Sequence, residues 1–141
     1  MRRFLTPVLL VLALVAGLTG CTSHPPLSGV ATELTGIQHA ADGTLTATVQ
    51  FDNGSVLAIN ISSSHHDILL NGQLIGTLDL SEPLGLPAQH NFSQTGTVKL
   101  TGAAPAAGEA SYQINSTLRV VTYGDSKELI KVGGSGTVTV K

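Results

Sequence analysis

The sequence predicts an all-β domain, an antiparallel β-sandwich of about seven strands, on three observations. The chain is rich in glycine, threonine, serine and valine, and charged residues make up only 11% of it, a composition that favours strands and turns. From Val30 onward apolar and polar residues alternate, and turn residues recur at intervals of about ten residues. Beyond the first twenty residues, no longer segment has helical periodicity, so short antiparallel strands packed as a sandwich are expected.

The first half of the domain alternates over segments that turn residues separate. Residues 30–38 predict a first strand, and Asp42-Gly43 predicts the turn after it. Residues 45–51 and 57–61 place apolar side chains on one parity, as half-buried strands do. Between them, Asp-Asn-Gly-Ser at 52–55 predicts a tight turn.

An Asn-Gly pair predicts a β-hairpin. Asn71-Gly72 joins two apolar-rich runs, residues 67–70 and residues 73–78. Both central residues of a type I′ turn need positive φ, which asparagine and glycine accept readily. The serines at 62–64 predict a break, so the histidines that follow are expected in a solvated loop leading into the hairpin.

The second half predicts a crossing loop followed by further strands. Two prolines place the crossing loop, because proline cannot donate a hydrogen bond to a sheet. The expected elements are a loop at 82–88, a strand at 92–100, a loop at 101–110, a long strand at 112–123, a turn at 124–126, and strands at 128–132 and 136–140, with a bend or bulge at Gly133-Gly134.

The first twenty residues have the features of a secretory leader. Arg2 and Arg3 form a short positive region, and residues 4–17 are apolar apart from Thr6 and Pro7. This run is shorter than the roughly 20 residues that span a bilayer. An uncleaved membrane helix and a buried helix of a cytosolic domain are the alternatives. The glycines and prolines that follow, without a charge cluster, disfavour both.

The residues Leu18, Thr19, Gly20 and Cys21 follow this run and resemble the lipobox of bacterial lipoproteins. The resemblance implies that Cys21 is acylated, for example with palmitate, and that the preceding peptide is removed. We therefore expect a signal peptide over residues 1–20, a lipidated tether over 21–28 and a β domain over 29–141. In such lipoproteins Thr22 is compatible with the outer membrane, facing the periplasm of a Gram-negative cell. Two or three acyl chains hold a protein firmly on a membrane.

The charge of the chain argues against nucleic acid as a partner. Seven basic residues stand against nine acidic ones, and removal of Arg2 and Arg3 leaves five basic residues, a formal charge of −4 with neutral histidines. No basic run or stripe exists to neutralise phosphates. The membrane is therefore expected to hold the protein through the lipid anchor rather than by charge.

Three motifs follow one another in an order typical of a known family. They are an alternating strand that ends at Asp52-Asn53-Gly54, the hairpin Leu-Asn-Gly-Gln-Leu-Ile-Gly at 70–76, and closing strands at 118–121 and 136–140. In this order, over residues 28–141, they resemble the late embryogenesis abundant (LEA) group 2 family, which includes the water stress and hypersensitive response (WHy) domain. The chain departs from the family's Asn-Pro-Asn turn, because Asn53 replaces the proline and Gly54 the second asparagine.

This resemblance implies an immunoglobulin- or fibronectin-III-like β-sandwich. It also implies a non-enzymatic protein linked to desiccation and cold tolerance, since no catalytic residues are known for the family. Bacterial members are often small lipoproteins, which agrees with the lipobox.

No residue cluster predicts catalysis, a metal or a cofactor. His65, His66 and Asp67 have the side chains of metal ligands, but adjacent strand residues point to opposite faces and two ligands make a poor site. The glycine-rich run at 133–136 contains Ser135 but lacks the strand–elbow–helix context of a catalytic nucleophile. We therefore expect no catalytic residue, no metal ligand and no cofactor.

The sequence thus predicts an envelope-anchored, non-enzymatic LEA-like lipoprotein that protects proteins or the envelope under desiccation or cold. Its clients would be partially unfolded proteins, and its working surface would be strand faces rich in Thr, Ser, Asn and Gln. The alternative is an accessory protein-interaction module of an envelope complex that docks through an exposed sheet edge. A hydrolase or metal enzyme, and a binder of small apolar ligands between the sheets, are further alternatives.

Overall fold

Eight β-strands make up the regular structure of this protein. The computed structural model describes residues 29–121 and 125–141, and no helix occurs among them. The strands are β1 (Val30–His39), β2 (Leu45–Asn53), β3 (Ile59–Leu70), β4 (Gln73–Leu80), β5 (Leu84–Leu86), β6 (Asn91–Leu100), β7 (Gly108–Val121) and β8 (Lys127–Val140). The prediction of an all-β domain is therefore confirmed.

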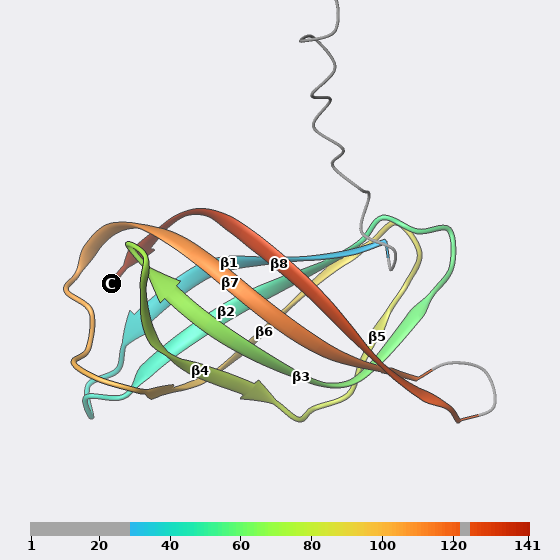
Figure 1. Cartoon of the computed structure of the whole chain (residues 1–141), viewed down its shortest axis with the longest axis horizontal. Helices are drawn as coiled ribbons and strands as arrows, with labels where there is room; N and C mark the ends of the chain where they lie inside the picture. The colour runs from blue at the N-terminus through green and yellow to red at the C-terminus, as the bar shows by residue number, and fades with distance from the viewer. Residues whose placement is uncertain (1–28, 122–124) are drawn as a thin grey trace, which may run out of the picture.

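The strands pair into one sheet that closes on itself (Figure 1). Along the sheet the order is β4-β6-β2-β1-β8-β7-β3, and β3 pairs back to β4. β5 lies outside this ring and pairs with the first residues of β3. The result is a closed barrel of seven strands with one additional strand. The predicted sandwich of two separate sheets, with immunoglobulin- or fibronectin-like architecture, is not confirmed.

The barrel closes through two short contacts. β1 and β8 pair in parallel at one position, Ile37 with Val140, and the Lys141 N–H donates to the Ile37 carbonyl (3.0 Å). β4 and β6 pair at only three positions, from Gly76 to Leu78 on β4. By contrast, β7 and β8 pair at fourteen positions. Two well-paired groups of strands, β6-β2-β1 and β4-β3-β7-β8, are therefore joined along short stretches.

Two glycines let the backbones approach where the barrel closes. A methyl group on Gly134 of β8 would overlap the backbone oxygen of Thr32 on β1, and one on Gly76 of β4 would overlap the backbone oxygen of Lys99 on β6. Glycine in a strand commonly marks such a close approach. The two glycines therefore lie at the two joins.

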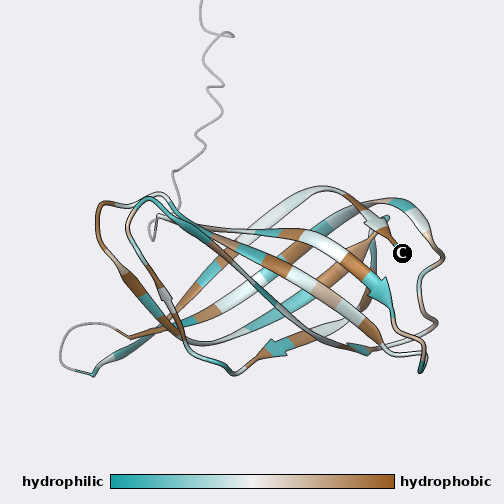
Figure 2. Ribbon diagram, turned by 180° about the vertical axis from the view of Figure 1, so that it is seen from behind, coloured by the Kyte–Doolittle hydropathy of each residue, from teal (hydrophilic) through white to brown (hydrophobic). Residues whose placement is uncertain are grey.

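Alternating side chains fill the barrel, and Figure 2 shows the alternation of hydropathy along the strands. On β2 and β7 the inward side chains lie on the parity that the sequence predicted. The buried apolar residues of these two strands are Leu45, Ala47, Val49, Phe51, Tyr112, Ile114, Leu118 and Val120. Burial of each Val, Leu, Ile or Phe side chain contributes about 1.5–3 kcal/mol, so these two strands supply much of the core.

The Asn-Gly hairpin is present as the sequence predicted. Asn71 has φ 49° and Gly72 has φ 80°, the positive values that a type I′ turn needs. The turn joins β3 to β4, and the Asn71 side chain accepts hydrogen bonds from Ser111 at the start of β7 (both 3.1 Å). The hairpin therefore also holds the neighbouring strand.

Three boundary predictions are wrong. β3 continues through the three serines, and its pairing register with β7 shifts by one residue between Ile61 and Ser63. β8 likewise continues through Gly133 and Gly134, which pair with β7. The predicted loop at 82–88 contains the short strand β5. In each case pairing with a neighbouring strand outweighs weak local β-propensity.

Candidate functional site

The predicted lipidation site lies outside the described residues. Cys21 and the lipobox residues Leu18, Thr19 and Gly20 belong to residues 1–28. In the part of the chain that the structure describes, no helix is long and apolar enough to cross a bilayer. Anchoring through Cys21 therefore stays a prediction.

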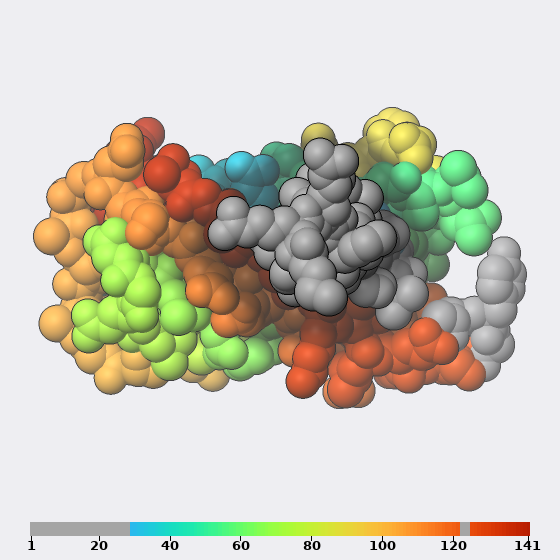
Figure 3. Space-filling view, turned by 45° about the horizontal axis from the view of Figure 1, so that its top comes forward, coloured from blue at the N-terminus to red at the C-terminus, as the bar shows by residue number. Residues whose placement is uncertain are grey.

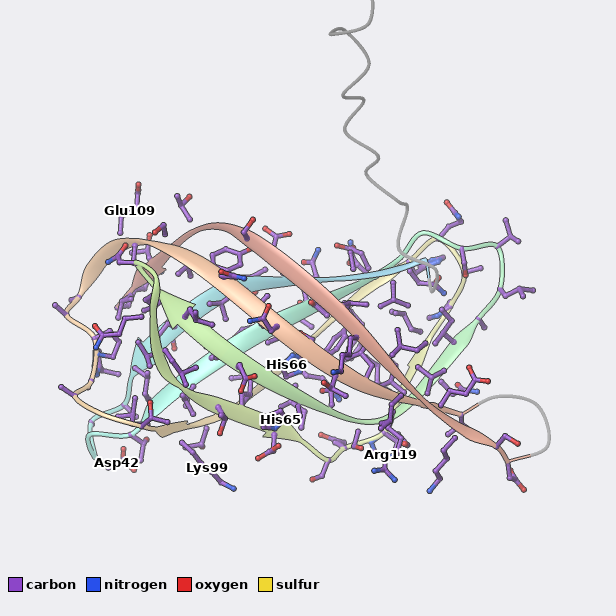
Figure 4. The ribbon with its side chains drawn as sticks, in the orientation of Figure 1. Asp42, His65, His66, Lys99, Glu109 and Arg119 are labelled. Carbon is purple, nitrogen blue, oxygen red and sulfur yellow. The ribbon has the colours of Figure 1, made fainter. Side chains whose placement is uncertain are left out.

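A chain of polar side chains crosses the interior of the barrel (Figure 4). His66 on β3 is 0% exposed. Its Nδ1 lies 2.7 Å from Ser116 Oγ on β7, and its Nε2 lies 2.8 Å from Ser64 Oγ. Ser116 Oγ in turn lies 3.1 Å from Thr32 Oγ1 on β1. These hydrogen bonds tie three strands together, and the edge of the Phe51 ring packs against the imidazole, with ring centroids 5.7 Å apart.

Burial keeps His66 neutral. Desolvation of the charged ring, and after it the neighbouring His65, lowers the pKa of His66 from 6.5 to about 4. A neutral imidazole has one N–H, so one ring nitrogen donates and the other accepts. A serine–histidine pair can begin nucleophilic catalysis, but Ser116 is only 2% exposed and its histidine not at all, which leaves no room for a substrate. The polar chain therefore serves to satisfy buried groups.

His65 lies on the opposite face of β3 and takes part in an exposed ionic cluster (Figure 4). Its Nδ1 lies 2.6 Å from Asp79 Oδ1, and its Nε2 lies 3.4 Å from Asp67 Oδ1. Lys99 Nζ lies 3.6 Å from the other oxygen of Asp79. The hydrogen bond between His65 and Asp79 raises the pKa of the histidine and lowers that of the carboxyl group. Such exposed pairs contribute about 0–1 kcal/mol each.

The two histidines lie in a strand, and their predicted placement in a solvated loop is wrong. The prediction that they point to opposite faces is correct, since one is buried and the other exposed. Among the described residues, no group of three or more His, Cys, Asp and Glu side chains is arranged to hold a metal ion. Ser135 lies within β8, where the sequence had suggested a bulge or turn.

Ser64 and Ser116, the buried serines that hold His66, were not among the residues predicted from the sequence. Ser116 lies on the same parity as Ile114 and Leu118, and this periodicity was a signal that it faces the core. Ser64 shares its parity with Ile68 and Leu70, but the register shift near Ser63 separates it from the parity of Ile61. Buried polar residues on an apolar parity are thus recognisable where the strand is regular.

Asn53 holds two loops together at one end of the barrel. Its side-chain nitrogen donates to the carbonyls of Leu57 (2.8 Å), Leu86 (3.2 Å) and Pro87 (3.1 Å). Its side-chain oxygen accepts from the backbone N–H of Ser55 (3.0 Å) and from its hydroxyl (2.7 Å). Asn53 is almost fully buried. Asn53 stands where the turn of the LEA group 2 family has a proline, and its hydrogen bonds hold the loops at this end of the barrel in place.

A groove of about 660 Å³ lies where β4 and β6 separate. Within the described residues, β6 pairs with β2 over residues 91–97 but with β4 only from residue 98 onward. The groove is lined by Phe92 and Gln94 on one side and by Leu80 and Leu84 on the other. The side chain of Gln94 bridges it by donating to the Glu82 carbonyl (3.1 Å). The barrel therefore has an open seam between β4 and β6, with a strand edge on each side.

Comparisons with known proteins show similarity in fold. No protein-family model matches the chain, and no curated protein matches it. The solution structure of AT1g01470 from Arabidopsis thaliana has a TM-score of 0.56 at 14% identity, covering 83% of this chain and 84% of that one. The structure of a candidate LEA protein, At2g46140.1, has a TM-score of 0.50 at 14% identity, covering 80% of this chain and 72% of that one. At such identity the likeness concerns the fold alone.

Proposed function

We propose that this chain is a non-enzymatic, lipid-anchored envelope protein whose LEA-like domain protects proteins or the envelope during desiccation or cold. The fold is similar to that of a candidate LEA protein, and the titratable groups of the interior are enclosed. The working part of the molecule is then its outer surface. A lipid anchor at Cys21 would hold this surface close to a membrane, which in a Gram-negative cell would be the outer membrane on its periplasmic side.

The observation that carries this proposal is the arrangement of polar side chains on the outer faces of the paired strands. On β2 and β6 the outward residues pair hydroxyl with hydroxyl or amide, and the Oγ1 atoms of Thr48 and Thr95 lie 2.7 Å apart. The outward pairs on these two strands are Thr46 with Thr97, Thr48 with Thr95, Gln50 with Ser93 and, at the end of the row, Asp52 with Asn91. The outward pairs on β7 and β8 include Ser111 with Thr137 and Gln113 with Ser135. Polar and mainly uncharged side chains therefore form ordered rows on two faces.

Such rows suit a surface that stays hydrated and binds weakly. Hydroxyl and amide groups both donate and accept hydrogen bonds, so they can keep water or replace it at the surface of a partially unfolded client. The low content of charged residues makes this contact insensitive to salt, which becomes concentrated when water is withdrawn.

A protection assay with residues 22–141 tests the proposal. A labile enzyme is dried, or frozen and thawed, with and without the domain, and an equal mass of an unrelated β domain serves as the control. We expect enzyme activity to be retained well above that control. Activity no better than the control would refute protection as a general function.

A matched variant tests whether the threonine rows are responsible. Replacing Thr48 and Thr95 by valine keeps the side-chain shape and β-propensity but removes two hydroxyl groups. We expect the double variant to fold and to protect less well than the original domain. Equal protection would show that the rows on β2 and β6 are not the working surface.

The open seam favours a second candidate function, an accessory interaction module in an envelope complex. The unpaired edge of β6 and the groove beside it provide backbone groups to which an extended segment of a partner could add. A photo-crosslinker at Ser81, which lines the groove, should then capture one discrete protein in the native envelope. The same crosslinker at Glu109, which lies at one end of the molecule (Figure 4) and does not line the groove, should not. Equal capture at both positions would contradict this alternative.

A further inference from the structure

An apolar loop lies beside the residue at which the described chain begins. The loop, residues 54–58, carries Val56 (84% exposed) and Leu57 (68% exposed), the two most exposed large apolar side chains among the described residues. The Gly54 N–H donates to the Gly29 carbonyl (2.8 Å). A tether that ends at Gly29 therefore enters the barrel directly against this loop.

The polar backbone groups of the loop are largely satisfied within the protein. The Gln89 side chain donates to the carbonyls of Gly54 (2.7 Å) and Ser55 (3.0 Å). The Asn53 side chain donates to the Leu57 carbonyl (2.8 Å), and the Leu57 N–H donates to the Ser55 hydroxyl (3.3 Å). Groups that already have partners lose little when water is removed. The loop therefore exposes two apolar side chains while several of its backbone N–H and C=O groups already have hydrogen-bond partners within the protein.

No charged side chain of the loop or its neighbour opposes contact with lipid. Residues 53–64 contain no Asp, Glu, Lys or Arg, and residues 83–98 contain none either. The second stretch includes the loop at 87–90, which lies beside the first one (Figure 3). The charged residues that begin β8, Lys127 and Glu128, lie at the other corner of this end (Figure 1). The loop at 54–58 and its neighbour at 87–90 are therefore uncharged, and the carboxylate beside them is that of Asp52, which lines a groove with Gly54 and Gln89.

We propose that the loop at residues 54–58 is a second membrane contact, in which Val56 and Leu57 lie at the boundary between lipid headgroups and acyl chains. This proposal rests on the lipid anchor of the proposed function. The segment from Cys21 to Gly29 can span at most about 28 Å, so an acylated Cys21 keeps the loop near the bilayer. Two apolar side chains bind lipid weakly on their own, but tethering raises their effective concentration at the surface.

A single tryptophan reports on the loop, because the chain has none of its own. The full chain carrying Leu57→Trp is purified from membranes and reconstituted into phosphatidylethanolamine–phosphatidylglycerol vesicles. We expect its emission to shift to shorter wavelength and to be quenched by lipids brominated on their acyl chains. The matched control is Leu74→Trp, an exposed position (45%) in the hairpin at the opposite end (Figure 1), which should show neither effect.

The outcomes separate this proposal from the lipid anchor on which it rests. Intact mass measurement of the same sample shows whether Cys21 carries acyl chains. An acylated protein whose Leu57→Trp emission matches that of the control refutes the loop contact but leaves the anchor. A shift to shorter wavelength without quenching places the loop against another protein and also refutes the loop contact. Absence of acyl chains overturns both proposals.

Discussion

At the scale of single residues, His66 couples the stability of the barrel to pH. Its folded pKa is about 4, against 6.5 for the unperturbed group. Between these values the unfolded chain binds a proton at this residue and the folded chain does not. Stability rises with pH wherever the unfolded state binds more protons. The buried histidine therefore destabilises the fold progressively as pH falls through this window.

We predict that the free energy of unfolding decreases by roughly 3 kcal/mol between about pH 7 and about pH 4, because one pKa unit corresponds to about 1.4 kcal/mol. His65 acts in the opposite direction, since its pKa is raised. Its stabilisation is present below pH 6.5 and is lost as pH rises through its folded pKa. Solvent screening keeps that effect small, because the side chain is about half exposed. Urea denaturation across the pH range measures the sum.

Two glutamine variants separate the contributions. His66→Gln removes the buried titrating group and should flatten the loss of stability toward acid pH, although the variant itself is less stable. His65→Gln removes only the exposed group and should leave most of the pH dependence in place. An unchanged pH dependence in His66→Gln would contradict the assignment.

Asn53 supports a second prediction at this scale. Asn53→Ala would leave the Leu57 and Leu86 carbonyls and the Ser55 N–H without their side-chain partner. We expect a loss of about 2 kcal/mol in the free energy of unfolding, since each unsatisfied group costs about 1–3 kcal/mol and water reaches some of them. Asn91→Ala, at an exposed position on the neighbouring strand, is the control and should change stability little. Equal losses would show that the network is not responsible.

Residue roles were predictable where the alternation is regular. Phe51 and Ile114 are buried as their parity indicates. The burial of His66 was not predicted although it shares its parity with Ile68 and Leu70, because the three serines before it were interpreted as a break in the strand. Asn53 was predicted as a turn residue, but its hydrogen bonds reach Leu86 and Pro87, far along the chain. Such partners carry no local signal in the sequence.

At the scale of strands, the absence of a side chain at Gly134 allows β8 to approach β1 closely. We predict that Gly134→Ala lowers the free energy of unfolding by about 2 kcal/mol or more, because the added methyl group overlaps the Thr32 backbone oxygen and overpacking typically costs about 1–3 kcal/mol. The neighbouring Gly133 is the matched control, since a methyl group there stays 3.4 Å from the nearest atom, the Ile114 oxygen. Urea denaturation of both variants measures the difference. Equal stability would contradict a close approach at this join.

The existence of the longer strands was predictable, but their extent was not. The sequence predicted separate strands on either side of Gly133-Gly134, whereas β8 is continuous. Glycine has low β-propensity, so a local interpretation places a bend there. The fourteen paired positions with β7 hold the strand extended despite this. The hairpin at Asn71-Gly72, by contrast, depends on two adjacent residues, and the sequence predicted it correctly.

At the scale of the whole molecule, the closure of the sheet into a barrel could not be predicted from the sequence. It depends on β1 meeting β8, the first and last strands, and on β4 meeting β6 across the short strand β5. Alternation shows that a strand has one buried face, but it does not show which strand lies beside it. A sandwich and a barrel with short joins therefore produce the same pattern.

The last prediction concerns how the whole protein is held at the envelope. If Cys21 is the anchor, the protein recovered from membranes begins at Cys21, carries acyl chains and resists extraction by high salt, because each buried methylene contributes about 0.8 kcal/mol and salt does not weaken this term. Cys21→Ser should carry no acyl mass, while Thr22→Ser, the adjacent control, should be acylated normally. Intact mass measurement and salt extraction of the three proteins provide the test. A protein that keeps residues 1–20 and binds the membrane equally in all three would instead indicate an uncleaved membrane helix, and the barrel would then be held by protein rather than by lipid.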